Sequence, residues 1–122
     1  MAKPRPGSFW QRRLSAFADA WRGVGFLLRD EAHARFHLLA TILVTCLGCW
    51  VELTKGEWLA LILAMGMVWT AEGLNSAIEA CVDLVCPEQH PLAGKAKDLA
   101  AGAVLLASIC ACVVGLLVFL AR

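Results

Sequence analysis

The segment from Leu99 to Ala121 contains no Asp, Glu, Lys or Arg, and this uncharged run constrains the fold more than any other feature. A helix needs about 20 apolar residues to cross the hydrocarbon core of a bilayer. Two shorter stretches without these charges precede it, Phe36 to Val51 and Trp58 to Ala71. Each becomes long enough with its polar ends, so that the second helix runs from about Glu57 to Cys86 and stops before Pro87. We therefore expect three membrane-spanning helices.

The composition also indicates a membrane protein. The chain has 122 residues, enough for one small domain, with a mean hydropathy of +0.69 and only 17% charged residues. Its net charge of +1 gives no general attraction to nucleic acid, which we exclude as a partner. None of the six cysteines has a histidine beside it at zinc-ligand spacing, so we expect free cysteines that act as small packing residues.

Residues 1–30 are expected to form an N-terminal tail and an amphipathic helix on the membrane surface. Ser8 followed by Gln11 has the form of a capping box, which marks a helix start. Apolar residues then recur at spacings of three and four: Trp10, Leu14, Phe17, Trp21, Val24 and Leu28. This single stripe suits the bilayer interface, and the alternative is a soluble helix packed on another protein. Residues 31–122 then form the three-span domain.

The basic residues near the spans predict the orientation in the membrane. Seven precede the first span: Lys3, Arg5, Arg12, Arg13, Arg22, Arg29 and Arg35. The first connection contains only Lys55, whereas the second contains Lys95 and Lys97. Because basic residues favour the cytoplasmic side, we expect the N-terminus and the second connection in the cytoplasm and Arg122 on the outer side. A secretory signal is not expected, since the N-terminal region lacks an apolar core followed by a cleavage site.

A polar stripe interrupts the second span. At about 100° per residue, five polar residues fall on one helix face: Glu72, Asn75, Ser76, Glu79 and Asp83. An ionisable side chain inside a span costs at least ~2.5 kcal/mol on insertion scales, so such residues usually mark a functional path. A purely structural role, hydrogen bonding to neighbouring helices, explains a single Asn or Ser better than three carboxylates on one face.

Carboxylates on one helix face suit metal-assisted transfer at the membrane surface. Two of them can hold a hard cation such as magnesium, and a third can accept a proton from a hydroxyl group. Further polar residues follow on the same side of the membrane: Glu88, His90, Lys95, Lys97 and Asp98. A cation there could meet phosphate oxygens, although the chain has no Walker-type glycine loop. Any nucleotide site must therefore be built differently.

Two motifs resemble the prokaryotic diacylglycerol kinase and undecaprenol kinase family. The first is E-x-x-N-S-A-I-E-x-x-x-D, from Glu72 to Asp83, and the second is H-P-L-A-G-K-A-K-D-L-A-A-G-A-V-L, from His90 to Leu105. The resemblance extends to Glu31 and Arg35 and covers nearly the whole chain. It implies an all-α homotrimer in the bacterial inner membrane, with composite active sites at the cytoplasmic face that use MgATP to phosphorylate a lipid alcohol.

The resemblance also implies roles for individual residues. It makes Glu72 the catalytic base, in contact with the lipid hydroxyl, and makes Glu31 and Glu79 the carboxylates that hold Mg²⁺. The positions that match ATP-binding residues are Arg12, Asn75, Asp83, Glu88, His90, Lys97 and Asp98. Trp21 and Arg35 match the region that binds the lipid substrate.

The sequence leaves alternatives open for the lipid acceptor and for the class of function. The H-P-L-A segment and the ending G-L-L-V-F-L resemble the undecaprenol-preferring branch more than the enterobacterial diacylglycerol kinases. A small oligomeric transporter would instead use membrane carboxylates as a proton relay. A structural scaffold would explain the spans but not the clustered charges.

Overall fold

The computed structural model describes residues 7–122, which form four α-helices and no β-strand. Lys3 and Arg5, two of the basic residues that predict the orientation, lie outside the described residues. The helices are α1 (Phe9–Asp30), α2 (Ala32–Trp50), α3 (Lys55–Val85) and α4 (Pro91–Leu120). Of these, α2, α3 and α4 are each long and apolar enough to cross a membrane. The expected architecture of an N-terminal helix and three spans is confirmed.

Short-range hydrogen bonds fix where the helices begin. At the start of α1, the backbone N–H of Gln11 donates to Ser8 Oγ (3.4 Å) and that of Ser8 donates to Gln11 Oε1 (2.9 Å). The expected capping box is therefore confirmed. Thr54 and Glu57 form a second capping box at the start of α3. Pro91 occupies the first turn of α4, where its missing N–H removes no helical hydrogen bond.

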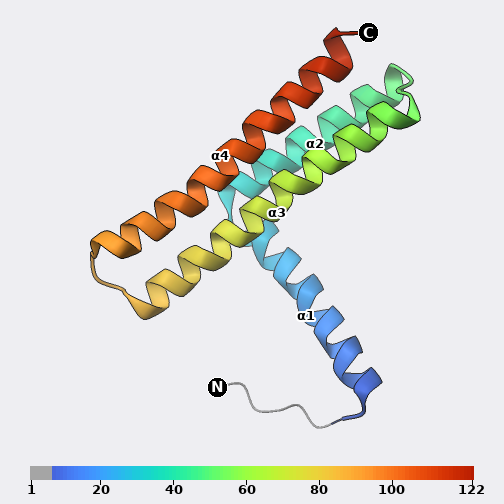
Figure 1. The fold of residues 1–122 in the computed structure, drawn as a ribbon. Coiled ribbons are helices and arrows are strands. Elements are labelled where there is room, and N and C mark those ends of the chain that lie inside the picture. The colour runs from blue at the N-terminus through green and yellow to red at the C-terminus, as the bar shows by residue number, and fades with distance from the viewer. Residues whose placement is uncertain (1–6) are drawn as a thin grey trace.

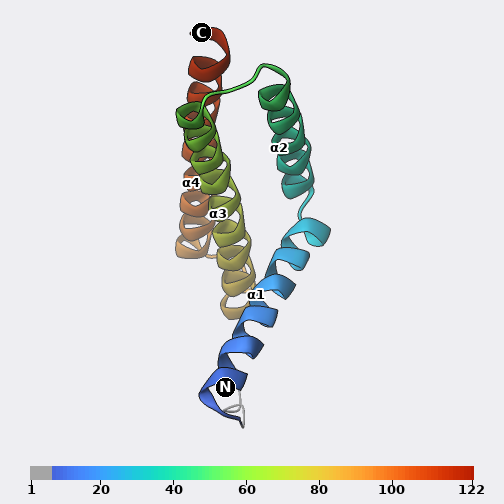
Figure 2. The same cartoon turned by 90° about the vertical axis from the view of Figure 1, so that its right-hand side faces the viewer.

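The helices α3 and α4 form an antiparallel pair that packs along much of its length, whereas α2 stands apart from α4 (Figure 1, Figure 2). Small residues let the pair approach closely, since Ala64 of α3 and Ala100 and Ala107 of α4 are buried. The contact between α2 and α3 is limited. After α1 the chain turns at Glu31, whose backbone is extended, so that α1 leads away from the three spans (Figure 2).

The two ends of the three spans differ, and we name them by their distance from α1. The proximal end comprises residues 31–41, 68–85 and 91–103, and the distal end comprises residues 44–65 and 107–122. Leu53, Leu61 and Val118 form a buried cluster at the distal end. Gly48 lies beside this cluster, at a place where the packed side chains leave no room for a larger residue. A Cβ there would come within 2.8 Å of the Trp58 ring and 2.9 Å of Leu53.

The apolar stripe of α1 lies on the surface of the chain. Trp10, Leu14, Phe17 and Trp21 are each more than 60% exposed, and α1 has no buried residue. An exposed apolar stripe of this kind is typical of a helix that lies in the bilayer interface. That placement in the membrane stays a prediction.

All six cysteines are free, as expected. Only Cys86 is half-buried, and the others are exposed on the surface of the chain: Cys46, Cys49, Cys81, Cys110 and Cys112. These five cysteines therefore contribute little to packing within a single chain.

Candidate active site

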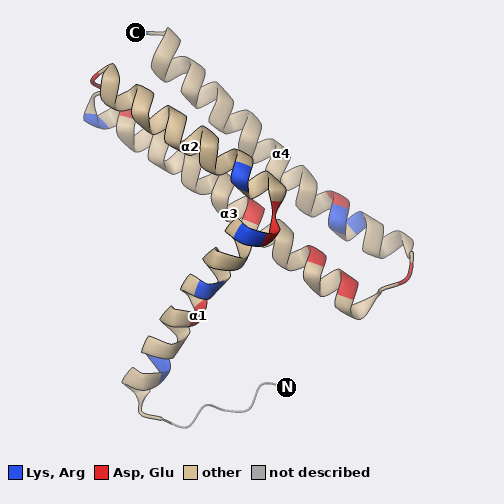
Figure 3. Ribbon diagram, turned by 180° about the vertical axis from the view of Figure 1, so that it is seen from behind, with Lys and Arg blue, Asp and Glu red and all other residues tan. Residues whose placement is uncertain are grey.

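Charged side chains gather at the proximal end of the spans. Acidic residues follow the proximal part of α3, and both signs of charge occur at the α1–α2 junction and in the first turns of α4 (Figure 3). The distal parts of α2 and α4 carry almost no charge in the same view. The polar stripe of α3 thus lies at the end of the spans where α1 joins them.

Glu72 is the most enclosed member of the polar stripe. It is the only buried charged residue among residues 7–122, with a side chain that is 5% exposed. Its Oε1 lies 2.8 Å from Nε2 of His37 on α2. An ionised carboxylate can only accept hydrogen bonds, so the imidazole donates from Nε2 when Glu72 is charged. This bond gives the buried carboxylate a partner in place of the water it has lost.

A second polar contact joins α2 to α3 close to the first. Nε1 of Trp69 donates to Oγ1 of Thr41 (3.0 Å), and that hydroxyl donates to the backbone carbonyl of His37 (2.7 Å). In the described part of the chain, no other side-chain hydrogen bonds connect these two helices. Because the remaining contact between α2 and α3 is limited, the two polar contacts are important for the position of α2.

The polar stripe becomes more exposed beyond Glu72. Asn75, Ser76 and Glu79 are half-buried, and Asp83 is exposed. Nδ2 of Asn75 donates to Oε1 of Glu79 at 3.4 Å. Oδ1 of Asn75 and Oγ of Ser76 are buried without a hydrogen-bond partner within residues 7–122. Unpaired buried polar atoms are costly, so these two are suited to meet a ligand or a neighbouring chain.

Glu31 and Glu79, the expected metal ligands, come from different parts of the proximal end, the start of α2 and the polar stripe of α3. The Glu31 side chain makes no hydrogen bond or ion pair among the described residues, and with Ser76 it lines a cavity of about 830 Å³ between α1 and α3. Within residues 7–122, the one hydrogen bond of the Glu79 side chain comes from Asn75. Across residues 7–122, no three His, Cys, Asp or Glu side chains gather into a metal site. The donors present are carboxylate and amide oxygens, which suit Mg²⁺, because Mg²⁺ commonly takes one or two carboxylates and completes its shell with water and phosphate.

Asp83 and Lys97, two of the expected ATP-binding residues, form an ion pair between α3 and α4. Nζ of Lys97 lies 2.5 Å from Oδ1 of Asp83. The two side chains are 39% and 66% exposed, so solvent screening leaves little stabilisation from the pair. The main consequence of the pair is to hold a cation beside the exposed end of the polar stripe.

Three other expected site residues have local partners. Arg12 donates from Nε to the carbonyl of Gly7 (3.2 Å), near the end of α1 that points away from the spans. Arg35 donates from Nη2 to the carbonyl of Arg29 (2.8 Å) and so binds the end of α1. Nδ1 of His90 accepts the backbone N–H of Leu92 (3.1 Å) and caps α4. The chain alone brings none of these three side chains into contact with Glu72.

Trp21 and Glu88 are also separate from the polar stripe. Trp21 is 63% exposed on α1 and packs edge-on against Phe17, with ring centroids 6.2 Å apart. Glu88 is exposed in the connection between α3 and α4. Both positions are open to a ligand or a neighbouring chain.

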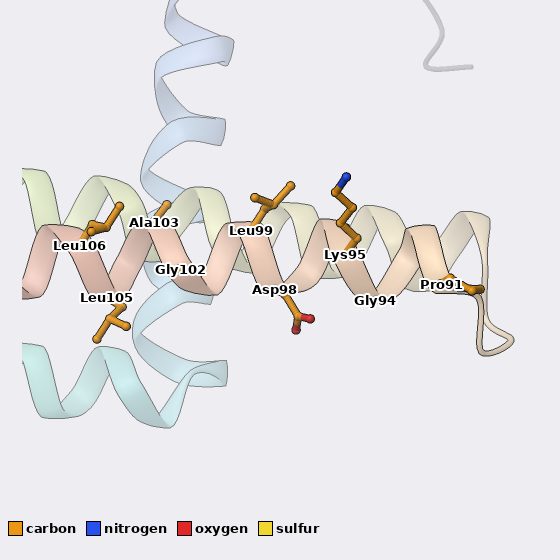
Figure 4. A pocket seen from close by; sticks show the side chains of 9 residues that line it. All are labelled: Pro91, Gly94, Lys95, Asp98, Leu99, Gly102, Ala103, Leu105 and Leu106. Carbon is orange, nitrogen blue, oxygen red and sulfur yellow. The ribbon is translucent and has the colours of Figure 1, made fainter.

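Asp98 lies on a face of α4 that no other helix covers. Together with Lys95 it lines a shallow depression that only α4 residues form (Figure 4). A depression on one helix does not enclose a nucleotide, so Asp98 needs a second surface to take part in such a site.

An apolar groove of about 610 Å³ separates α2 from α4. His37 and Trp69 line it at the proximal end, and Leu47 and Leu120 line it at the distal end. Most of the lining side chains between them are apolar. The groove therefore offers an apolar path along the spans that reaches the partner of Glu72.

Sequence reasoning did not select His37. The first span was recognised by its lack of Asp, Glu, Lys and Arg, and a histidine does not interrupt such a run. The rule that an ionisable residue within a span is a candidate functional residue, applied to histidine, would have found it. Its partner was not predictable, because Glu72 lies 35 residues further along the chain.

Comparisons with known proteins show the family. Residues 18–119 match the family described as prokaryotic diacylglycerol kinase. The chain is 41% identical over 111 residues to the undecaprenol kinase of Bacillus subtilis (strain 168), which covers 91% of this chain and 90% of that protein. It is 37% identical over 100 residues to the diacylglycerol kinase of Escherichia coli (strain K12), 82% of each chain. A transporter function finds no support in these matches. The chain belongs to the prokaryotic diacylglycerol kinase family, and the activity class expected from its sequence, a membrane lipid kinase, is confirmed.

Proposed function

We propose that this kinase transfers the γ-phosphoryl group of ATP to the terminal hydroxyl of a lipid alcohol, with Glu72 as the general base. The observation that carries the proposal is the buried carboxylate of Glu72, held by His37 at the enclosed end of the polar stripe. A carboxylate buried within a membrane-spanning helix is costly and usually has a function. Membership of the family supports a lipid as the acceptor.

The proposed reaction is a displacement at the γ-phosphorus. Glu72 accepts the hydroxyl proton while the lipid oxygen bonds to the γ-phosphorus, and the bond from that phosphorus to the bridging oxygen breaks to release ADP. Negative charge on the phosphoryl oxygens must be matched by nearby cations. We assign this role to Lys97, which its pairing with Asp83 holds at the proximal end.

We assign Mg²⁺ to the carboxylates of Glu31 and Glu79. Bound together with ATP, the ion would supply positive charge to the phosphates. Asn75 orients Glu79 through its amide group. The absence of a protein partner for the Glu31 side chain within residues 7–122, and the unpaired Oγ of Ser76, which lines the same cavity, support a ligand between α1 and α3.

Undecaprenol is our proposed acceptor, with diacylglycerol as the second lipid to test. The 41% identity to an undecaprenol kinase and the 37% identity to diacylglycerol kinases support both lipids. Both present a hydroxyl at headgroup depth with apolar chains in the bilayer. The apolar groove that reaches His37 supports an acceptor with long apolar chains.

We propose a homotrimer in the bacterial inner membrane, with the proximal end and the N-terminus in the cytoplasm. The excess of basic residues before the first span supports this orientation. Unpaired polar atoms on α3 and the uncovered position of Asp98 support a site that neighbouring chains complete. Arg12, Trp21, Arg35, Glu88 and His90 keep their proposed roles in binding ATP or lipid within such an assembly.

The test is to incubate the purified protein with labelled MgATP and vesicles that contain undecaprenol, diacylglycerol or neither. We expect labelled lipid phosphate with at least one acceptor, and its loss when magnesium is chelated. Vesicles without acceptor control for background hydrolysis of ATP. If neither lipid is phosphorylated, the proposed function is wrong.

A further inference from the structure

His37 donates a hydrogen bond to the carboxylate proposed as the base, and the proposed reaction gives His37 no role. Its Nε2 lies 2.8 Å from Oε1 of Glu72, and the side chains of His37 and Glu72 are only 18% and 5% exposed. We infer that His37 is the positioning residue of the base: it holds Oε1 of Glu72, so that Oε2 faces the lipid hydroxyl. This inference rests on the proposed function of Glu72.

The two oxygens of Glu72 have different surroundings. Oε1 is bonded to His37, whereas Oε2 has no hydrogen-bond partner within residues 7–122. A carboxylate with one oxygen fixed cannot rotate freely about its last bond, and the other oxygen then points in one direction. The free oxygen is the one that can accept the hydroxyl proton.

The hydrogen bond also connects the base to the proposed metal ligand. His37 and Glu31 belong to the same stretch of chain, since Glu31 is the N-cap residue of α2 and His37 follows it by six positions. Six positions correspond to about 9 Å along a helix axis. Because α2 makes limited contact with α3, a bond from His37 to Glu72 sets how far Glu31 lies from the base. Loss of this bond would therefore misplace both the base, Glu72, and the proposed metal ligand, Glu31.

Two replacements of His37 by an amide side chain distinguish a positioning role from a purely structural one. In His37→Gln the terminal N–H reaches about as far as Nε2, whereas in His37→Asn it falls short by one methylene group. Both replacements are polar and small enough for the same space, so a cost in folding should affect them alike. We expect His37→Gln to keep kcat within about threefold of wild type and His37→Asn to lower it about tenfold or more, with KM for ATP little changed in both.

Two further measurements separate positioning from stability. In the Glu72→Gln background, His37→Asn should lower the residual rate by less than about twofold, because the group on which it acts is already lost. The control is His33→Asn, an exposed histidine one turn earlier on α2, which should leave kcat near wild type. Equal kcat in His37→Gln and His37→Asn, or a further tenfold loss in the double variant, would overturn the inference.

The hydrogen bond itself can be measured without turnover. In protein labelled with ¹⁵N-histidine, the spectrum contains three histidines, His33, His37 and His90, and His37→Gln identifies the signal of His37. We expect a protonated Nε2 whose signal shifts in Glu72→Gln but not in Glu52→Gln. An unchanged signal would rule out the positioning role even if the wild type is an active kinase. A shifted signal in a protein that phosphorylates no lipid would instead show that the hydrogen bond exists and that the proposed function is wrong.

Discussion

At the distal end of the spans, Leu53, Leu61 and Val118 pack together. The Thr54–Glu57 capping box gives hydrogen-bond partners to backbone N–H groups at the start of α3. Arg122 adds a hydrogen bond to the carbonyl of Val51 (3.0 Å). At the proximal end, by contrast, two buried atoms of the polar stripe lack partners within residues 7–122, and charged residues such as Asp83 and Asp98 are exposed. Within residues 7–122, the buried side-chain polar atoms that lack a partner therefore lie at the proximal end and not at the distal end. The difference supports our proposal that ligands and neighbouring chains complete the proximal end, whereas the buried cluster stabilises the distal end.

The largest expected effect of a single substitution is at the proposed metal site. Glu79→Gln removes a carboxylate charge while keeping the shape of the side chain, and its bond to Asn75 can persist. We expect kcat to fall by a factor on the order of 10³, since charge on the transferred group is no longer balanced, while expression and assembly stay near wild type. The rate is measured by transfer of labelled phosphate to vesicle lipid.

Glu52→Gln is the matched control, because Glu52 is an exposed carboxylate in the distal turn. Full activity of Glu79→Gln over a range of magnesium concentrations would remove the metal assignment. It would also weaken the contrast between the two ends.

Lys97→Met should give the next largest effect. The cation serves both the bound nucleotide and the transition state, so we expect a decrease in kcat and an increase in KM for ATP, each about tenfold. The loss of its ion pair with exposed Asp83 should change stability little, because solvent screens the pair. Titration of ATP at saturating lipid gives both constants, with Lys55→Met at the distal end as the control. An unchanged KM for ATP would place the nucleotide elsewhere.

Gly48→Ala tests the distal end alone. The new methyl group would lie within 3 Å of the Trp58 ring and Leu53, which must move to accept it. We expect a loss of about 1–3 kcal/mol in stability, measured as a lower unfolding temperature in detergent, with kcat per folded molecule near wild type. Gly56→Ala is the control, because a Cβ at Gly56 has nothing within 4 Å. A large fall in kcat without a change in stability would show that the two ends are not separate in function.

Thr54→Ala should have the smallest effect. It removes the hydroxyl that accepts the backbone N–H of Glu57 (3.3 Å) and thus breaks the capping box of α3. We expect about 1 kcal/mol of lost stability and no change in either kinetic constant. Thr54→Ser keeps the hydroxyl and should behave as wild type. If Thr54→Ala altered KM for ATP, the start of α3 would have to influence the opposite end of the helix.

Much of the fold was predictable from the sequence because the signals are local. Uncharged runs marked the three spans, and Ser8 with Gln11 marked the start of α1. The separation of α2 from α4 was not predictable, since the apolar pattern of a helix in a membrane does not reveal which neighbour it packs against. Only the assembled helices show the groove between them.

The candidate site was predictable to the extent that it lies on one helix. Helical periodicity placed Glu72, Asn75 and Glu79 on one face, and the structure shows burial that decreases along that face. Contacts between helices, such as those of His37 with Glu72 and of Lys97 with Asp83, depend on how the spans meet and could not be read from spacing. Residues such as Arg12 and Asp98 stay apart within one chain, so their proposed roles depend on assembly.

The central claim is that Glu72 acts on the acceptor hydroxyl, and Glu72→Gln tests it most directly. ATP is titrated at saturating lipid, and lipid is then titrated at saturating ATP, with Glu52→Gln as the control. We expect MgATP to bind as in wild type, with KM for ATP little changed, while kcat falls on the order of 10²-fold or more, as for removal of a general base. A kcat near wild type with a raised KM for ATP would contradict the account, because Glu72 would then be a nucleotide or metal ligand and the base would lie elsewhere.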